Sequence, residues 1–244
     1  QKKKKRSESP CLFNTNKTEK NNLIKMLGKS AHLATILALC FIQLSQAYSA
    51  TEDARIIAEY KRNLNKTGIE LDHAKIARTL VHQANWAAVG TISTNSAVLG
   101  FPMVNIISVN DNDVYGHSSG SIQFLLTDLD FTGPDWQSNN KVTFLFTDEQ
   151  TLHCSRKYPN SIDPMEPTCP RVIISGEVIK MDKNSPIYDS AIVSFVERHP
   201  AAKNWLKAHT FYLCELDIKN IFVLDYYGGP HTVKADDYYN VKLQ

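Results

Sequence analysis

A serine-centred motif is the first candidate for chemistry in this 244-residue chain. Residues 116–120 (GHSSG) match GxSxG, the pattern that presents the nucleophilic serine of many hydrolases. That serine requires a strand–turn–helix in a parallel α/β sheet, with an acidic residue and a histidine later in the chain. The neighbouring segments predict antiparallel strands instead, so we interpret the motif as a Ser- and Gly-rich loop and expect no catalytic residue here.

Three aspartates, Asp128, Asp130 and Asp135, form the second candidate, a cation site. Their spacing lacks the central glycine and the terminal glutamate of a calcium-binding EF-hand loop. The sequence also contains no CxxC pair and no Cys/His spacing typical of zinc. We expect the aspartates to mark a solvated helix start, where the helix dipole favours negative charge, and we predict no metal ligand.

The N-terminal part of the chain has the pattern of a secretory signal over residues 26–49. Met26 begins a short charged segment, residues 31–44 are apolar, and a small-residue site predicts cleavage after Ser49. A run of 14 apolar residues is too short to cross a bilayer about 30 Å thick as a helix. We therefore expect a secreted protein with no membrane span.

Residues 1–25 contain a basic run, residues 2–6 (KKKKR), that alone is typical of nuclear localisation or nucleic-acid binding. We interpret residues 1–25 as an upstream extension outside the native protein, because a signal starts at its own initiator methionine. From Ala50 onward the chain has 18 Lys and Arg against 23 Asp and Glu, a net charge of −5. That balance removes the electrostatic argument for a nucleic-acid partner.

Two of the three cysteines that follow the signal, Cys154 and Cys169, bracket a polar, proline-rich loop. In the oxidising environment that secretion implies, they are the natural disulfide pair; the alternative is two buried free thiols. The third, Cys214, shares a strand face with apolar residues, which indicates a buried structural thiol.

The remaining pattern predicts one domain of mainly antiparallel strands with packed helices, residues 71–244. A polar lead-in, residues 50–70, precedes it and carries the only sequon of the secreted chain, so Asn65 is the expected N-glycosylation site. Residues 110–113 (NDND) predict a hairpin turn. The predicted helices cover residues 71–81 and a segment between Ser185 and His199, and the predicted strands cover residues 86–94, 103–109, 142–147, 171–181 and two short stretches within 210–225.

A set of motifs in a fixed order resembles the CREG family, the secreted cellular repressors of adenoviral early-protein-stimulated genes. The cysteine loop is one of them, and the others are residues 77–81 (ARTLV), 86 (W), 91–94 (TIST), 100–102 (GFP), 174–178 (ISGEV), 198–200 (RHP), 224–230 (LDYYGGP) and 238–241 (YYNV). The resemblance implies the split β-barrel of flavin-binding, pyridoxamine-phosphate-oxidase-like proteins, assembled as a homodimer. It also implies a non-enzymatic glycoprotein of growth control, differentiation and endosome–lysosome function, bound by mannose-phosphate receptors and possessing no flavin.

The positions of the Arg and Lys residues bear on whether this chain can bind flavin mononucleotide. The phosphate of flavin mononucleotide is held by Arg or Lys, yet neither residue occurs from Thr79 to Asn140, and residues 127–136 are acidic. Distant arginines such as Arg171 and Arg198 leave the alternative open, an FMN-dependent oxidoreductase. We expect no cofactor and no enzymatic activity. A third hypothesis, a nuclear transcriptional repressor, would require the basic run at residues 2–6 to belong to the native protein and the secretory signal not to function.

Overall fold

The computed structural model describes residues 55, 72–157, 163–227 and 229–243. The extension, the signal, the lead-in apart from residue 55, and the sequon asparagine Asn65 lie outside these residues. The described residues from 72 onward belong to one compact unit. Within the described residues, none of the helices combines the length and the apolar character needed to cross a membrane.

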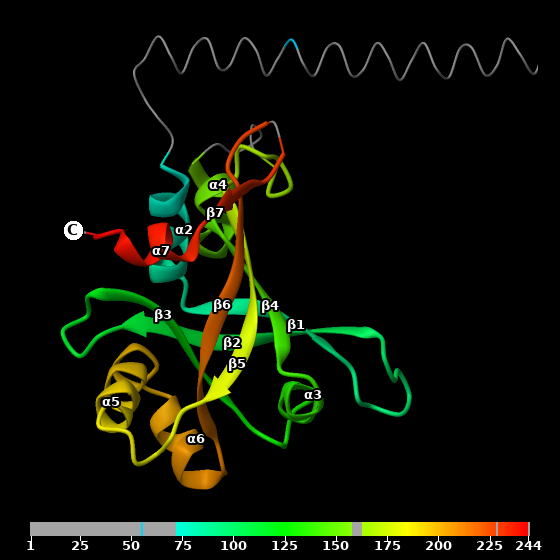
Figure 1. Ribbon diagram of the computed structural model, residues 1–244, viewed down its shortest axis with the longest axis vertical. Helices are drawn as coiled ribbons and strands as arrows, with labels where there is room; N and C mark the ends of the chain where they lie inside the picture. Colours follow the sequence, from blue (N-terminus) through cyan, green and yellow to red (C-terminus); the bar gives the residue numbers. More distant parts are fainter. Residues whose placement is uncertain (1–54, 56–71, 158–162, 228, 244) are drawn as a thin grey trace, which may run out of the picture. The chain divides into compact units, whose positions relative to one another are not determined.

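Six antiparallel strands close into a barrel, and a seventh strand extends it (Figure 1). Their order is β3-β2-β1-β4-β5-β6-β7, and a further pairing of β3 with β6 closes the ring. The strands are β1 (Trp86–Ile92), β2 (Pro102–Asn112), β3 (Ser118–Leu126), β4 (Lys141–Thr147), β5 (Arg171–Lys180), β6 (Tyr212–Leu224) and β7 (His231–Val233).

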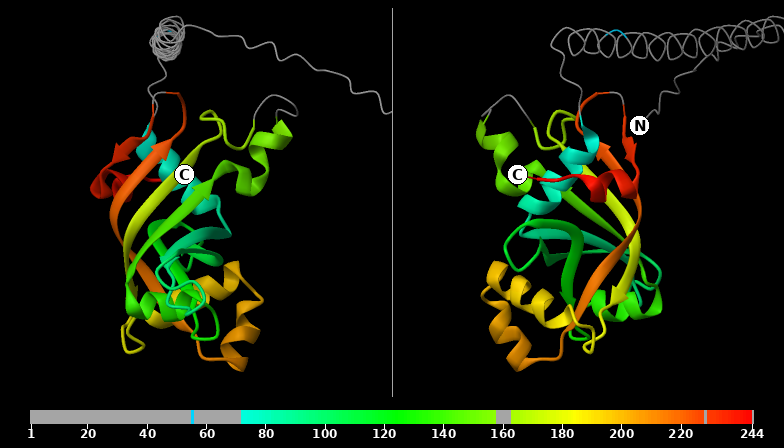
Figure 2. Two further views of the ribbon diagram at one scale, coloured as in Figure 1. Left: turned by 90° about the vertical axis from the view of Figure 1, so that its right-hand side faces the viewer. Right: turned by 60° about the vertical axis from the view of Figure 1, so that its left-hand side comes forward.

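The helices gather at the two ends of this barrel (Figure 2). Helices α2 and α7 lie at one end, beside β7, and helices α5 and α6 lie at the other. The helices are α2 (His73–Gln83), α3 (Thr132–Ser138), α4 (His153–Lys157), α5 (Tyr188–Arg198), α6 (Ala202–Ala208) and α7 (Ala235–Asn240), with a 3₁₀ turn, η1 (Asp148–Thr151).

Helix α2 plugs its end of the barrel because one of its faces is apolar. Asp72 caps the helix by accepting a hydrogen bond from the Lys75 amide at 2.9 Å. Leu80 and Val81 are buried in the same core as the inward side chains of the strands. Burial of each such side chain contributes about 1.5–3 kcal/mol, so the helix predicted over residues 71–81 forms, displaced by two residues.

Two local predictions were wrong. Strand β2 continues through Asn110 to Asn112, with a register shift, and the turn follows at residues 113–117. The NDND composition is typical of turns, but Asn110 and Asp111 are buried and take distant partners, which override the local preference. Strand β6 is one strand of 13 residues that pairs with three neighbours, where two short strands were expected.

Candidate functional site

A groove of about 650 Å³ lies on the strands of the barrel. Small residues form much of its floor, and the Thr143 and Ser175 hydroxyls hydrogen-bond each other there at 2.9 Å. Residues of β1, β2, β4, β5 and β6 contribute to the lining. The groove is therefore built by the rigid barrel rather than by loops, as ligand sites on such scaffolds usually are.

Two lysines enter the groove, and each has an acidic neighbour. Lys141 of β4 lies opposite Glu177 of β5 in the sheet register. Lys219 donates a hydrogen bond to Asp217 at 2.6 Å, and this bond raises the pKa of Lys219. Each groove lysine therefore lies beside a carboxylate that would compete with a phosphate for it.

The buried arginines of the described residues have structural partners. Arg78 of α2 is 2% exposed and donates to the Ser118 hydroxyl and carbonyl and to the carbonyls of Tyr238 and Tyr239. Its guanidinium therefore joins α2 to β3 and to α7. A side chain held by several oxygens in the core is not free to bind a ligand.

Arg198 of α5 is the second such arginine. It donates to the carbonyl of Ala84 at 2.9 Å and lies 3.3 Å from the buried carboxylate of Asp111. Asp111 also accepts a hydrogen bond from the Ser118 hydroxyl at 2.6 Å. Because Arg78 donates to the same hydroxyl, Asp111 contacts Arg198 directly and Arg78 through Ser118. Arg198, which the sequence left open as a phosphate ligand, instead fastens α5 to β2.

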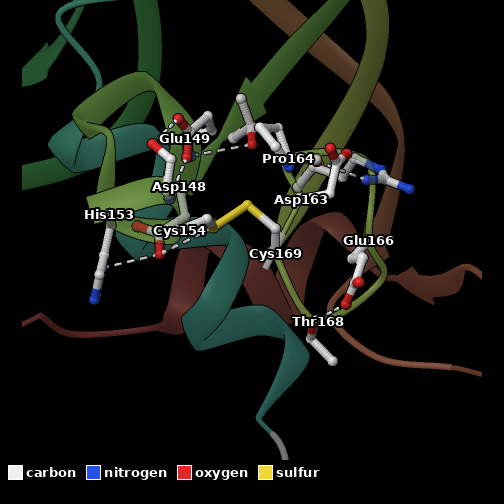
Figure 3. The surroundings of a disulfide bond; sticks show 12 residues. Asp148, Glu149, His153, Cys154, Asp163, Pro164, Glu166, Thr168 and Cys169 are labelled. Carbon is white, nitrogen blue, oxygen red and sulfur yellow. Dashed lines mark hydrogen bonds and ion pairs between the residues drawn. A yellow bond between two sulfur atoms is a disulfide. The ribbon is translucent and has the colours of Figure 1, made fainter. Parts of the chain in front are cut away.

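The predicted disulfide between Cys154 and Cys169 is present, with the two Cα atoms 5.8 Å apart (Figure 3). Both cysteines are buried, whereas the other described residues of the loop between them are exposed or half-buried. Arg171 donates to the Met165 carbonyl at 2.9 Å and so holds the loop that leads to Cys169. This second arginine left open as a phosphate ligand thus also has a structural role.

The three aspartates of the acidic segment do not converge. Asp128 accepts a hydrogen bond from the Tyr212 hydroxyl, and Asp130 accepts one from the Asn105 amide, both at 2.7 Å. Asp135 was expected to be solvated but is 2% exposed, since it ties α3 to the end of β1. Its partners are the Thr91 hydroxyl and the amide and hydroxyl of Thr94, at 2.7–2.8 Å. Burial opposes ionisation of Asp135, but these hydrogen bonds prevail and lower its pKa.

The GxSxG segment has no nucleophile geometry. Gly116 lies in the turn after β2, and residues 118–120 belong to β3, which is antiparallel to β2. The Ser118 hydroxyl donates to Asp111, and the Ser119 hydroxyl donates to the Asp111 carbonyl at 2.7 Å. These serines hold two strands together. The interpretation as a loop is corrected to a hairpin.

Sequence reasoning did not single out Asp111 or Arg78 as members of a buried network. Their partners lie 40 or more residues away for Arg78 and up to 87 residues away for Asp111, so no local pattern marks them. Cys214, in contrast, is a buried free thiol as predicted, and burial raises its pKa to about 12.

The CREG β-barrel family model matches residues 69–240. Protein CREG1 of Homo sapiens is 37% identical over 173 residues, which cover 71% of this chain and 76% of that protein. Protein CREG1 of Mus musculus is 35% identical with the same coverage, and that of Gallus gallus is 32% identical over 69% of this chain and 86% of that protein.

Solved structures share the fold at low identity. A heme binding protein from Mycobacterium smegmatis superposes with a TM-score of 0.53 at 14% identity, over 70% of this chain and 61% of that chain. Protein Atu2129 from Agrobacterium tumefaciens, of unknown function, gives 0.50 at 16% identity, over 70% and 62%. The expected split barrel with packed helices is confirmed.

Proposed function

Because the chain belongs to the CREG family, we propose that it is a secreted glycoprotein without enzymatic activity that acts through protein partners. The proposal includes delivery to lysosomes through mannose-phosphate receptors and roles in growth control and differentiation. N-terminal sequencing of the secreted protein tests the first step, and Ala50 is the expected first residue. A start at Met26 would contradict secretion by this signal.

The observation that carries the non-enzymatic proposal is the placement of the positive charges. A flavin phosphate has close to two negative charges and needs charge-assisted hydrogen bonds worth about 1.5–3 kcal/mol each. Arg78, Arg171 and Arg198 donate to groups within the fold, and the groove lysines face Glu177 and Asp217. Loss of two such bonds weakens binding by about 100-fold or more.

Titration of the purified secreted protein with flavin mononucleotide tests this proposal. We expect no binding at micromolar concentrations by calorimetry and no yellow colour in the protein as purified. Micromolar or tighter binding would overturn the proposal in favour of an oxidoreductase. In that case Lys141→Ala and Lys219→Ala should each weaken binding by about tenfold or more, which would assign the flavin to the groove.

The proposed homodimer is supported by an apolar surface on β2, β1 and β4. Ile106 and Leu145 both flank Ala88 in the register, so the three side chains form a row on one face. Val104 lies beside them opposite Gly90, and Val104 and Ile106 are 69% and 62% exposed. Exposed apolar side chains grouped on a rigid sheet are typical of protein interfaces.

A charge placed in this surface should separate the subunits. We expect the wild-type protein to sediment as a dimer and the Ile106→Asp variant to sediment as a monomer at the same concentration, with unchanged circular dichroism. The matched control is Met165→Asp, since Met165 is 79% exposed but lies in the disulfide loop. A monomeric wild type, or a dimer that persists in Ile106→Asp, would contradict this assignment of the interface.

A further inference from the structure

Two histidines and one aspartate that are distant in the chain meet beside the C-terminal hairpin. His73 is the first residue of α2, Asp225 directly follows β6, and His231 begins β7. His231 pairs with Val223 in the register, which brings it alongside Asp225. One ligand atom from each of the three side chains lies within 4.8 Å of the others. From these residues we propose a zinc-binding site.

The carboxylate of Asp225 is the first argument. Its side chain is 2% exposed, and one oxygen lies 2.7 Å from Nδ1 of His73. The other oxygen, Oδ1, is buried with no hydrogen-bond partner among the described residues and lies 3.9 Å from Nε2 of His231. A buried, unpartnered carboxylate oxygen is costly, and a cation between Oδ1 and the imidazole would satisfy it.

The two imidazoles are the second argument. The rings of His73 and His231 stack with their centroids 3.9 Å apart and their planes 13° apart. The stack places both imidazoles beside the carboxylate, and because a metal ion lies close to the plane of each imidazole that binds it, one ring turns out of the stack when both nitrogens bind the ion. The side chains of His73 and His231 are 27% and 43% exposed, so an ion and a bound water can reach the site from solvent.

The distances fit zinc. Two ligand atoms about 2.1 Å from a tetrahedral zinc ion lie about 3.4 Å apart. That value falls between the 2.7 Å and 3.9 Å that separate the Asp225 oxygens from the two ring nitrogens, so side-chain rotation can bring these ligand atoms to one ion. Two nitrogens and one carboxylate with an open position suit zinc, whereas calcium and magnesium prefer oxygen ligands.

Zinc would replace a proton. The Asp225 carboxylate only accepts hydrogen bonds, so Nδ1 of His73 carries the hydrogen in the contact at 2.7 Å. Binding of zinc to that nitrogen requires the proton to leave or to move to Nε2. The ion would then fasten the start of α2 to the hairpin of β6 and β7, across 152 residues of sequence.

The test uses the secreted chain, produced without a histidine tag and freed of metal by a chelator. Calorimetric titration with zinc chloride should give one site with a dissociation constant in the micromolar range or tighter. His73→Gln and His231→Gln should each weaken binding by about 100-fold, because each removes one of three ligands. Cobalt should give the visible absorption bands of a tetrahedral site, and both variants should lose them.

The matched control is His117→Gln. His117 also contacts a carboxylate, that of Asp113 at 3.3 Å, but no described residue offers this pair a third ligand. The variant should therefore bind zinc like the wild type. Circular dichroism and thermal unfolding in chelator would show that the variants are folded. The absence of saturable binding in the wild type, or wild-type affinity in either His73→Gln or His231→Gln, would overturn the proposal.

Discussion

At the scale of single residues, Arg78 shows how this fold satisfies a buried cation without a directly bound carboxylate. Its guanidinium donates to the Ser118 hydroxyl, and that hydroxyl donates to Asp111 at 2.6 Å. The Tyr238 ring lies 5.2 Å from the guanidinium carbon and adds a cation–π contact. The charge of Arg78 is therefore balanced by Asp111 only through the Ser118 hydroxyl. This arrangement requires every group around the guanidinium to stay in place.

Gly120 is one such group. A Cβ atom at this position would lie 2.3 Å from Nη1 of Arg78, and the backbone φ is +82°. Gly116 has a similar φ of +83° but open space around it. Gly116→Ala should therefore cost only the left-handed backbone strain, about 1–2 kcal/mol, whereas Gly120→Ala should cost roughly 2 kcal/mol more because it also displaces Arg78.

Urea unfolding of both variants measures this difference. The comparison cancels the backbone contribution, so the excess in Gly120→Ala reports the contact with Arg78. Equal free energies of unfolding for the two variants would show that the guanidinium moves without cost, and the description of Arg78 as a fixed structural cation would fail.

At the scale of elements, the disulfide fixes the loop between β4 and β5. The bond closes a ring of 15 residues, and in the chain-entropy model such a ring stabilises the fold by about 3 kcal/mol. The Cys154→Ser, Cys169→Ser double variant should lower the free energy of unfolding by about 2–5 kcal/mol, measured by urea unfolding. Wild-type protein unfolded with a reductant should show the same loss.

Thiol counting provides the control for this prediction. Burial raises the pKa of Cys214 to about 12, so native protein that starts at Ala50 should label no thiol. Unfolding without a reductant should expose Cys214 alone, and reduction should expose Cys154 and Cys169 as well. Three reactive thiols in unreduced, unfolded protein would contradict the disulfide.

The elements also show which features the sequence could predict. Helix α2, strands β1, β4 and β5 and the disulfide follow local patterns of hydrophobicity and composition, so their prediction succeeded. Asp111 and Asp135 lie in segments whose local composition indicates turns or solvent exposure, yet both are buried. Their partners come from distant parts of the chain, and no window of neighbouring residues contains that information.

At the scale of the whole molecule, the charge changes sign with pH. The chain from Ala50 has a net charge of −5 near pH 7, and its seven histidines would bring this toward +2 in an acidic compartment. His199 resists that change. It joins α5 to β2 through a 2.8 Å hydrogen bond from Nε2 to the Val109 carbonyl and packs against Phe195.

Burial, with a smaller contribution from the Arg198 charge, lowers the pKa of His199 below 6.5, although the Val109 carbonyl opposes the shift. Below pH 6.5 the unfolded chain therefore binds a proton more readily than the folded chain. The contribution of His199 to stability is complete above pH 6.5 and declines as the pH falls through its lower folded-state pKa. His199→Gln keeps a donor for the Val109 carbonyl but cannot titrate.

Urea unfolding at about pH 7.5 and about pH 5 measures this effect. Wild-type protein should lose more stability between the two values than His199→Gln, and the variant should lie closest to the wild type at the acidic value. His209→Gln is the matched control, since it removes an exposed histidine at the end of α6 and leaves the contact between His199 and Val109 in place. If wild-type protein and His199→Gln lost equal stability, His199 would not limit the acid tolerance of this fold, and delivery to an acidic compartment would face no penalty at this residue.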